Sequence, residues 1–138
     1  MKYIKTLIIS IICLVLLFIT SYFSMQDYSE SPASSCLDCN YATDVLFFSF
    51  LGTVLLTILL FIIKKLIKNK LAVSVVVTIG FLVMTIMINH SLFVDRVSSW
   101  STFSFNEEIA YVIRESYSYI IIASVLFWIS IIKLRIFN

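Results

Sequence analysis

The chain has 138 residues, of which 61% are hydrophobic and only 13% are charged. A soluble domain typically carries about 25% charged residues, and a small one cannot bury so much apolar surface. The composition therefore excludes an ordinary soluble fold and predicts an integral membrane protein. Two glycines and one proline are present, which favours long uninterrupted helices over a barrel of many turns.

Four apolar runs, each close to the roughly twenty residues that a helix needs to cross a bilayer, predict four transmembrane helices. They cover residues 4–23, 45–63, 71–91 and 109–132. The connections are two polar loops and one basic loop, residues 24–44, 92–108 and 64–70. We expect an all-α, antiparallel four-helix bundle that forms a single membrane domain over residues 1–138.

Basic and acidic residues are separated along the chain. The two ends and the middle loop hold eight bases and no acid: Lys2, Lys5, Lys64, Lys65, Lys68, Lys70, Lys133 and Arg135. The other two loops and the adjoining helix ends hold all eight acids, with only Arg96 and Arg114 as bases. The positive-inside rule places the basic side in the cytoplasm. We expect both termini there, and a bacterial inner membrane as the location.

An alternative for the first run is a cleaved signal peptide, in which Lys2 and Lys5 would form the basic region. Its apolar stretch exceeds the usual core of about 7–15 residues. No small-x-small cleavage site directly follows Phe23. We therefore predict an uncleaved membrane span.

Small and hydroxyl residues recur at helical spacing within the runs. The main examples are Thr6, Ser10, Cys13, Thr20, Ser24, Ser49, Thr53, Thr57, Ser74, Thr78, Thr85 and Asn89. Such stripes are typical of helix–helix contacts in membranes, where each interhelical hydrogen bond contributes about 0.6 kcal/mol. The alternative, a polar permeation path, is disfavoured because no run carries a charged residue near its middle.

Cys36 and Cys39 form a Cys-x-x-Cys motif in the first polar loop. In an oxidising compartment, two thiols this close are expected to pair. The disulfide then either staples the loop or takes part in redox chemistry, since thiol pKa values in such motifs are easily lowered. The neighbouring acids Glu30, Asp38 and Asp44 disfavour a reactive thiolate, so we expect a staple.

Four spans, cytoplasmic ends and Cys36-Leu37-Asp38-Cys39-Asn40-Tyr41 before the second span resemble the DsbB/BdbC family. The resemblance implies electron transfer from a thioredoxin-like oxidant to a membrane quinone, through Cys36 and Cys39. The chain lacks the family's second cysteine pair, since residues 92–108 contain no cysteine. Ala42-Thr43-Asp44 follows where the family has an Arg.

Two further resemblances rest on shorter or more general motifs. Size, topology and the turn Lys64-Lys65-Leu66-Ile67-Lys68-Asn69 are similar to colicin A-type immunity proteins, which are small four-span inner-membrane proteins. Phe23-Ser24-Met25-Gln26 after the first span resembles VanZ-like proteins, but their His at the start of the second span is missing. None of the resemblances covers more than the topology and a short motif.

Seven ionisable residues are expected to gather at the outer ends of the third and fourth spans: His90, Asp95, Arg96, Glu107, Glu108, Arg114 and Glu115. A His with two carboxylates can perform acid–base chemistry. However, acids at a helix start favour the helix dipole, and Arg114 can reach outward to pair with Glu115 or Asp95. We expect a structural cluster and an interfacial His90, with no catalytic residue.

A metal site is not expected, because His90 is the only histidine and no second cysteine pair exists. On the opposite side, four lysines are expected to anchor the topology and to contact anionic lipid, at about 1 kcal/mol per basic residue. They are Lys64, Lys65, Lys68 and Lys70.

No phosphate-binding glycine loop or nucleophile motif is present. We therefore expect a non-enzymatic protein that binds or regulates another membrane or envelope protein, of the immunity, regulatory or accessory-subunit type. Its expected partners are that protein and the lipid bilayer, without nucleic acid or cofactor. The alternative is a thiol oxidoreductase that uses Cys36 and Cys39 with a quinone.

The charge separation predicts the topology directly. Reporter fusions at Asn69 and Asn138 should read cytoplasmic, and fusions at Ser35 and Ser101 should read external, because the basic segments stay inside. Paired phosphatase and fluorescent-protein fusions measure this. An external signal at Asn138 would contradict the four-span topology.

Overall fold

The computed structural model describes residues 2–36 and 39–134, which form four long helices and two short 3₁₀ turns. The helices are α1 (Lys2–Ser24), α2 (Tyr41–Leu66), α3 (Lys70–Arg96) and α4 (Phe105–Lys133), and the turns are η1 (Gln26–Tyr28) and η2 (Ser98–Trp100). The described residues contain no strand, so the predicted all-α class is confirmed. Each long helix is sufficiently long and apolar to cross a membrane.

The helices extend beyond the predicted apolar runs, mostly at the ends near the two long loops. α2 begins at Tyr41 because the Asn40 side chain accepts a hydrogen bond from Ala42 N at 2.9 Å. α4 begins at Phe105 because Ser104 and Glu107 form a capping box. Apolarity marks the stretch that suits hydrocarbon, whereas capping side chains decide where a helix starts.

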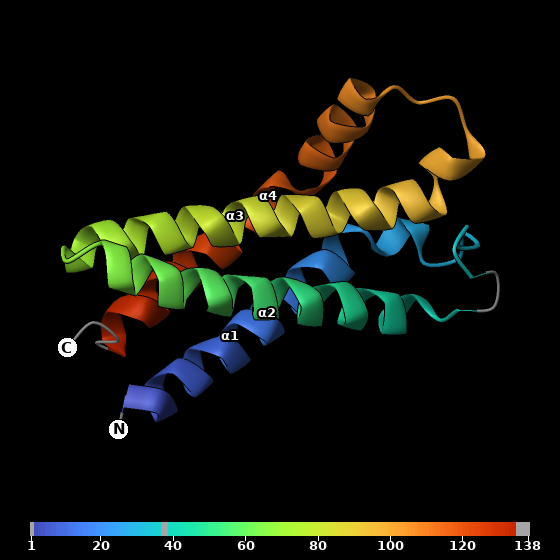
Figure 1. Cartoon of the computed structure of the whole chain (residues 1–138). Coiled ribbons are helices and arrows are strands. Elements are labelled where there is room, and N and C mark those ends of the chain that lie inside the picture. The colour runs from blue at the N-terminus through green and yellow to red at the C-terminus, as the bar shows by residue number, and fades with distance from the viewer. Residues whose placement is uncertain (1, 37–38, 135–138) are drawn as a thin grey trace.

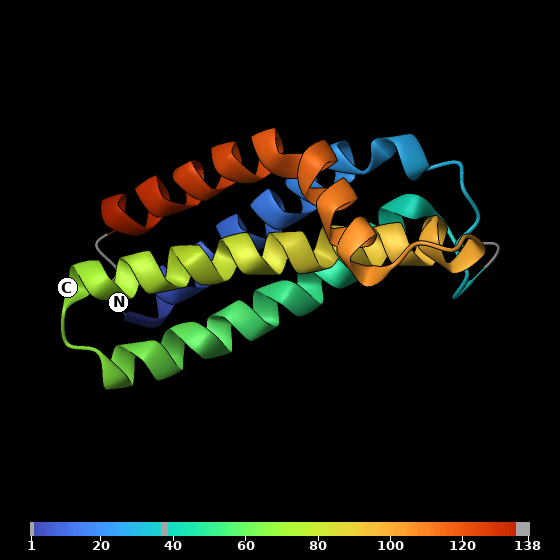
Figure 2. The ribbon, with the colours of Figure 1, turned by 90° about the horizontal axis from the view of Figure 1, so that it is seen from above.

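The four helices run alternately up and down (Figure 1). Each helix packs on the next along the chain, and α4 closes the bundle against α1. The start of α1, the end of α4 and the α2–α3 turn lie at one end of the bundle, and the two long loops lie at the opposite end (Figures 1 and 2). We call the first end the basic end, since the described lysines Lys5, Lys64, Lys65, Lys68, Lys70 and Lys133 belong to it. The other is the polar end.

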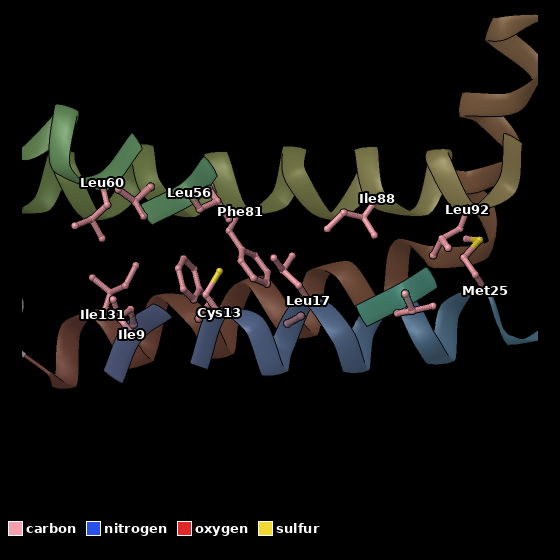
Figure 3. Packing of buried hydrophobic residues seen from close by; sticks show 14 of the residues in the cluster. Ile9, Cys13, Leu17, Met25, Leu56, Leu60, Phe81, Ile88, Leu92 and Ile131 are labelled. Carbon is pink, nitrogen blue, oxygen red and sulfur yellow. The ribbon is translucent and has the colours of Figure 1, made fainter. Parts of the chain in front are cut away.

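The core lies along the bundle axis, and its largest members come from facing helices. Phe81 of α3 is fully buried and stacks on Phe127 of α4 with ring centroids 4.4 Å apart. Figure 3 shows Phe81 pointing from α3 toward Cys13 and Leu17 of α1. The small Cys13 side chain leaves room for this ring, which lets α1 and α3 meet across the bundle.

Most residues of the predicted stripes are buried in the bundle, whereas Ser10, Thr57 and Thr78 are half-buried. Ser49, Thr53, Ser74, Thr85 and Asn89 are all buried. Four threonine hydroxyls of the stripes, however, bond to the carbonyl four residues earlier in their own helix rather than across an interface, and Ser49 Oγ and Ser74 Oγ make no hydrogen bond. The stripes therefore act mainly by being small, because a hydroxyl that returns to its own backbone needs no partner on the next helix.

Side-chain hydrogen bonds also join α1 to its neighbours. Ser10 of α1 and Thr57 of α2 lie 2.9 Å apart through their hydroxyl oxygens. Asn89 of α3 is fully buried and donates from Nδ2 to Ser24 Oγ of α1 at 3.0 Å. These bonds link α1 to two neighbours, one in the basic half and one in the polar half.

The first part of α4 leans away from the rest of that helix and passes over α3 (Figures 1 and 2). Ser116 lies in this region, and its Oγ donates to Val112 O at 2.6 Å. A serine that bonds back to the carbonyl four residues earlier often bends a helix. The exposed Arg114 and Glu115 lie on this part of α4.

Large apolar side chains cover the outer surface of the bundle. Leu7, Phe47, Ile79 and Ile122 are each more than half exposed and come from four different helices. An apolar surface on every side is incompatible with water but suits lipid tails. The chain is thus a small polytopic membrane protein.

Close helix packing should depend on Gly52. A Cβ atom there would lie 3.0 Å from Ile88 Cδ1 and 3.1 Å from Met84 Cγ, both on α3. Gly52→Leu should therefore lower the free energy of unfolding by about 1–3 kcal/mol through overpacking. Unfolding in detergent with increasing sodium dodecyl sulfate measures this. Leu51→Phe adds bulk on the lipid side and should change it by less than about 0.5 kcal/mol, and equal effects would contradict the packing.

Candidate functional site

The polar end is organised around Arg96, the last residue of α3, which is only 3% exposed. Its guanidinium donates from Nη2 to Asp44 Oδ2 of α2 at 2.6 Å. Nη1 donates to two loop carbonyls, Ser31 O at 2.6 Å and Ser29 O at 3.2 Å. Nη2 also reaches Cys39 O at 3.5 Å. One side chain thus connects α3, the start of α2 and both ends of the first loop.

Arg96 also contacts an aromatic ring that reaches α1. Its Cζ atom lies 5.1 Å from the centre of the Tyr41 ring, within range of a cation–π interaction. The Tyr41 hydroxyl donates to backbone carbonyls near the end of α1, Tyr22 O at 2.9 Å and Ser21 O at 3.2 Å. Arg96 is therefore coupled, directly or through Tyr41, to three of the four helices.

The chemistry of arginine explains why this position holds an Arg. Removing a charged group from water costs several kcal/mol, so a buried guanidinium needs a counter-ion and hydrogen bonds to most of its N–H groups. The planar fork of Arg96 can address a carboxylate and several carbonyls at once, which a lysine ammonium cannot reproduce. The loop carbonyls accept hydrogen bonds from the buried guanidinium, and the same bonds hold the loop in place.

Asp95 fixes the neighbouring part of the same loop. Its carboxylate accepts hydrogen bonds from Ser34 Oγ and Ser35 N, both at 2.8 Å, and from Ser35 Oγ at 3.0 Å. Its main-chain oxygen accepts from Ser34 N at 2.8 Å. Trp100 of η2 adds a bond from Nε1 to Pro32 O at 3.1 Å. The first loop is therefore attached to α3 and to the second loop.

Cys36 and Cys39 form a disulfide, with Cα atoms 5.3 Å apart. Cys39 is exposed and directly precedes Asn40, the N-cap of α2. The acids that were expected to disfavour a thiolate are placed unequally. Asp44 is neutralised by Arg96, Glu30 is exposed, and Asp38 lies outside the described residues. Because Asp44 is paired with Arg96 and Glu30 is exposed, the described acids disfavour a reactive thiolate less than the sequence suggested.

A second polar group links α3 to the start of α4. Glu108 Oε2 lies 2.9 Å from His90 Nε2, and Glu108 Oε1 accepts a hydrogen bond from Ser98 Oγ. His90 and Ser98 both contact the carboxylate rather than each other. This arrangement lacks the hydrogen bond between serine and histidine that would activate the serine as a nucleophile. The group therefore positions the leaning part of α4 and does not form a catalytic triad.

Aromatic rings fill the space beneath this group. Phe93 of α3 stacks on Tyr111 of α4 at 5.2 Å and meets Tyr28 and Phe103 edge-on, each at 5.6 Å. Burial raises the pKa of the Tyr28 hydroxyl above its ordinary value, and the neighbouring Tyr111 raises it further. Tyr28 is thus a neutral packing residue that fastens η1 to the bundle.

The predicted polar cluster is therefore divided. His90 and Glu108 meet, Asp95 and Arg96 each hold the first loop, and Glu107 caps α4. Arg114 is exposed, and the expected pairing with Glu115 or Asp95 is not made. On the basic end, Lys65, Lys68 and Lys70 are exposed and Lys64 is half-buried. Among the described residues, no three His, Cys, Asp or Glu side chains gather to hold a metal ion.

Sequence reasoning missed the partners of Arg96. Asp44 was considered only as a neighbour of the cysteines, and Tyr41 and Ser98 were given no role at the site. One signal was available: Arg96 is one of only two bases among the eight acids of that side. It predicts that Arg96 pairs with an acid but not which one, because Asp44 is 52 residues away in the sequence.

No protein-family model matches the sequence, and neither a curated protein nor a solved structure matches the chain. We therefore infer function from the chemistry of the polar end.

Arg96→Gln should lower the free energy of unfolding by about 3–5 kcal/mol, because it leaves the half-buried Asp44 without its counter-ion. Arg96→Lys keeps the charge but loses the fork, so its effect should be intermediate. Unfolding titrations measure stability, and hydrogen exchange over residues 29–36 measures loop order. Arg114→Gln removes an exposed charge and should cost less than about 0.5 kcal/mol. Unchanged exchange in Arg96→Gln would contradict the assigned role.

Proposed function

We propose that the chain is a non-enzymatic membrane protein that binds another membrane or envelope protein through its polar end. The supporting observation is the burial of Arg96 among loop carbonyls. This contact fixes the shape of the first loop before any partner arrives. A surface that is already ordered loses less entropy on binding and so binds more tightly for the same contacts.

The charge on this surface indicates the chemistry of the partner. Asp44, Asp95 and Glu108 are engaged within the protein. Four acids of the polar end are exposed among the described residues, although one of them, Glu107, also caps α4, and they stand against a single exposed base, Arg114. They are Asp27, Glu30, Glu107 and Glu115. A partner with a basic surface would associate faster and more selectively with such an end.

Exposed aromatic residues lie next to these acids. Trp100 is 58% exposed although its Nε1 is bonded to Pro32, and Phe103 is 40% exposed. Rigid aromatic side chains are typical anchors of protein interfaces. The surface thus combines an ordered backbone, one dominant charge and apolar anchors, which together suit recognition of a regulatory or immunity type.

A thiol oxidoreductase of the DsbB kind is the second candidate, and one observation favours it. The Cys36–Cys39 disulfide lies on the surface, directly before the start of α2. A helix N-terminus stabilises a thiolate, and reactive cysteines occur in such surroundings. A quinone would be the electron acceptor in this case.

Photo-crosslinking in the native membrane distinguishes the candidates. A crosslinkable residue at Glu30 should capture one discrete protein, and the same residue at the lipid-facing Ile122 of α4 should not. Capture should fall at least tenfold in Glu115→Lys, because an exposed charge that makes no cap is reversed while the fold is kept. Replacing both Cys36 and Cys39 by Ser should leave capture unchanged.

The single variants Cys36→Ser and Cys39→Ser test the second candidate. Each would trap a mixed disulfide if the motif exchanges thiols with a partner. A trapped thioredoxin-like protein, or quinone reduction that is lost in both variants, would overturn the binding proposal. Equal capture at Glu30 and Ile122 would also overturn it, because the polar end would then have no selective partner.

A further inference from the structure

A groove of about 350 Å³ runs between α1 and α2 on the outer surface of the bundle. Its walls are apolar and include Ile11 and Leu14 of α1 and Phe50, Ile58 and Phe61 of α2. Ser10 and Thr57 form the floor of the groove, where their hydroxyl oxygens lie 2.9 Å apart. Because both side chains are small, the floor lies lower than the larger side chains around it.

The polar atoms on the floor are already satisfied. Ser10 Oγ lies 3.0 Å from Thr6 O, Thr57 Oγ1 lies 2.8 Å from Thr53 O, and the two hydroxyl oxygens lie 2.9 Å apart, so both hydroxyl protons are used within this group. A polar occupant would find no free hydroxyl proton to accept. The groove therefore suits an apolar occupant, since burying unpaired polar atoms against it would be unfavourable.

The dimensions of the groove match one lipid tail. From Phe50 to Phe61 the helix rises about 16 Å, close to half of the roughly 30 Å hydrocarbon core. A transmembrane helix about 10 Å wide would need roughly 1,200 Å³ over this length, several times the volume present. An extended acyl chain fits the groove, whereas a helix would rest only on its rim.

Lysines lie at the mouth of the groove on the basic end. Lys65 follows Ile58 and Phe61 by seven and four residues, so helical spacing places it on the groove-lining face of α2, one turn beyond Phe61. Lys65 is exposed, and Lys64 lies beside it in the last turn. A lipid whose tail occupies the groove would place its phosphate near these charges.

We propose that the α1–α2 groove and Lys65 form a binding site for an anionic phospholipid of the leaflet at the basic end, with one acyl chain in the groove and the phosphate at Lys65. The charge selects the headgroup and the groove retains the tail. The two parts of the site can therefore be removed separately.

Native mass spectrometry of the full chain, freed of lipid in detergent, tests this by titration with dioleoyl phosphatidylglycerol and dioleoyl phosphatidylcholine. Phosphatidylglycerol should bind more tightly. Lys65→Gln should reduce its advantage about fivefold, the equivalent of about 1 kcal/mol for one basic residue. Lys133→Gln, the same change at an exposed lysine of α4 on the same end, should reduce it less than twofold.

Filling the groove should affect both lipids. Ile58→Trp should weaken the binding of each at least fivefold and leave their ratio unchanged, whereas Ile62→Trp, on an exposed position outside the groove, should change neither. Equal effects of Lys65→Gln and Lys133→Gln would overturn the proposal, because the preference would then follow total charge. A dimer that is lost in Ile58→Trp while lipid binding persists would assign the groove to a second copy instead.

Discussion

The burial of the Arg96 guanidinium is the constraint on which the polar end depends. An antiparallel bundle brings the C-terminus of α3 beside the N-terminus of α2, so a negative dipole end and a positive one lie together. The positive Arg96 lies at the negative C-terminus of α3, and the negative Asp44 lies at the positive N-terminus of α2. Each charge is therefore favoured by its own helix, and the two charges also attract each other. Arg96 Nη1 and Nη2 also bond to loop carbonyls, so the loop conformation follows from a requirement of the helix pair.

The fold was predictable from the sequence because its causes are local. The four apolar runs and the alternation of basic and acidic connections can each be recognised in short stretches of sequence. Together they specify four helices in an antiparallel order. The contacts at the site were not predictable. Arg96 bonds to main-chain oxygens of Ser29 and Ser31, and a carbonyl carries no signature in the sequence. The spatial neighbours also lie more than fifty residues apart.

The stripes of small residues were correctly placed on the buried faces, but for an incomplete reason. Thr53, Thr78 and Thr85 bond to carbonyls of their own helices, so their contribution to packing is their size. The same behaviour accounts for the lipid-facing groove. Where Ser10 and Thr57 use their two hydroxyl protons on each other or on their own backbones, the surface between α1 and α2 is both low and apolar. The small hydroxyl residues at these two positions thus determine both the α1–α2 contact and the groove beside it.

The disulfide and the Arg96 contacts hold different lengths of the first loop. Closing a four-residue loop by a disulfide stabilises a fold by only about 2 kcal/mol in the chain-entropy model. Residues 29–35 are held instead by Arg96 and Asp95. Breaking the Cys36–Cys39 bond would therefore leave most of the loop in place. The proposed recognition by the polar end would depend on Arg96, whereas any thiol exchange would depend on the cysteines, so the two candidate functions draw on separable residues of one surface.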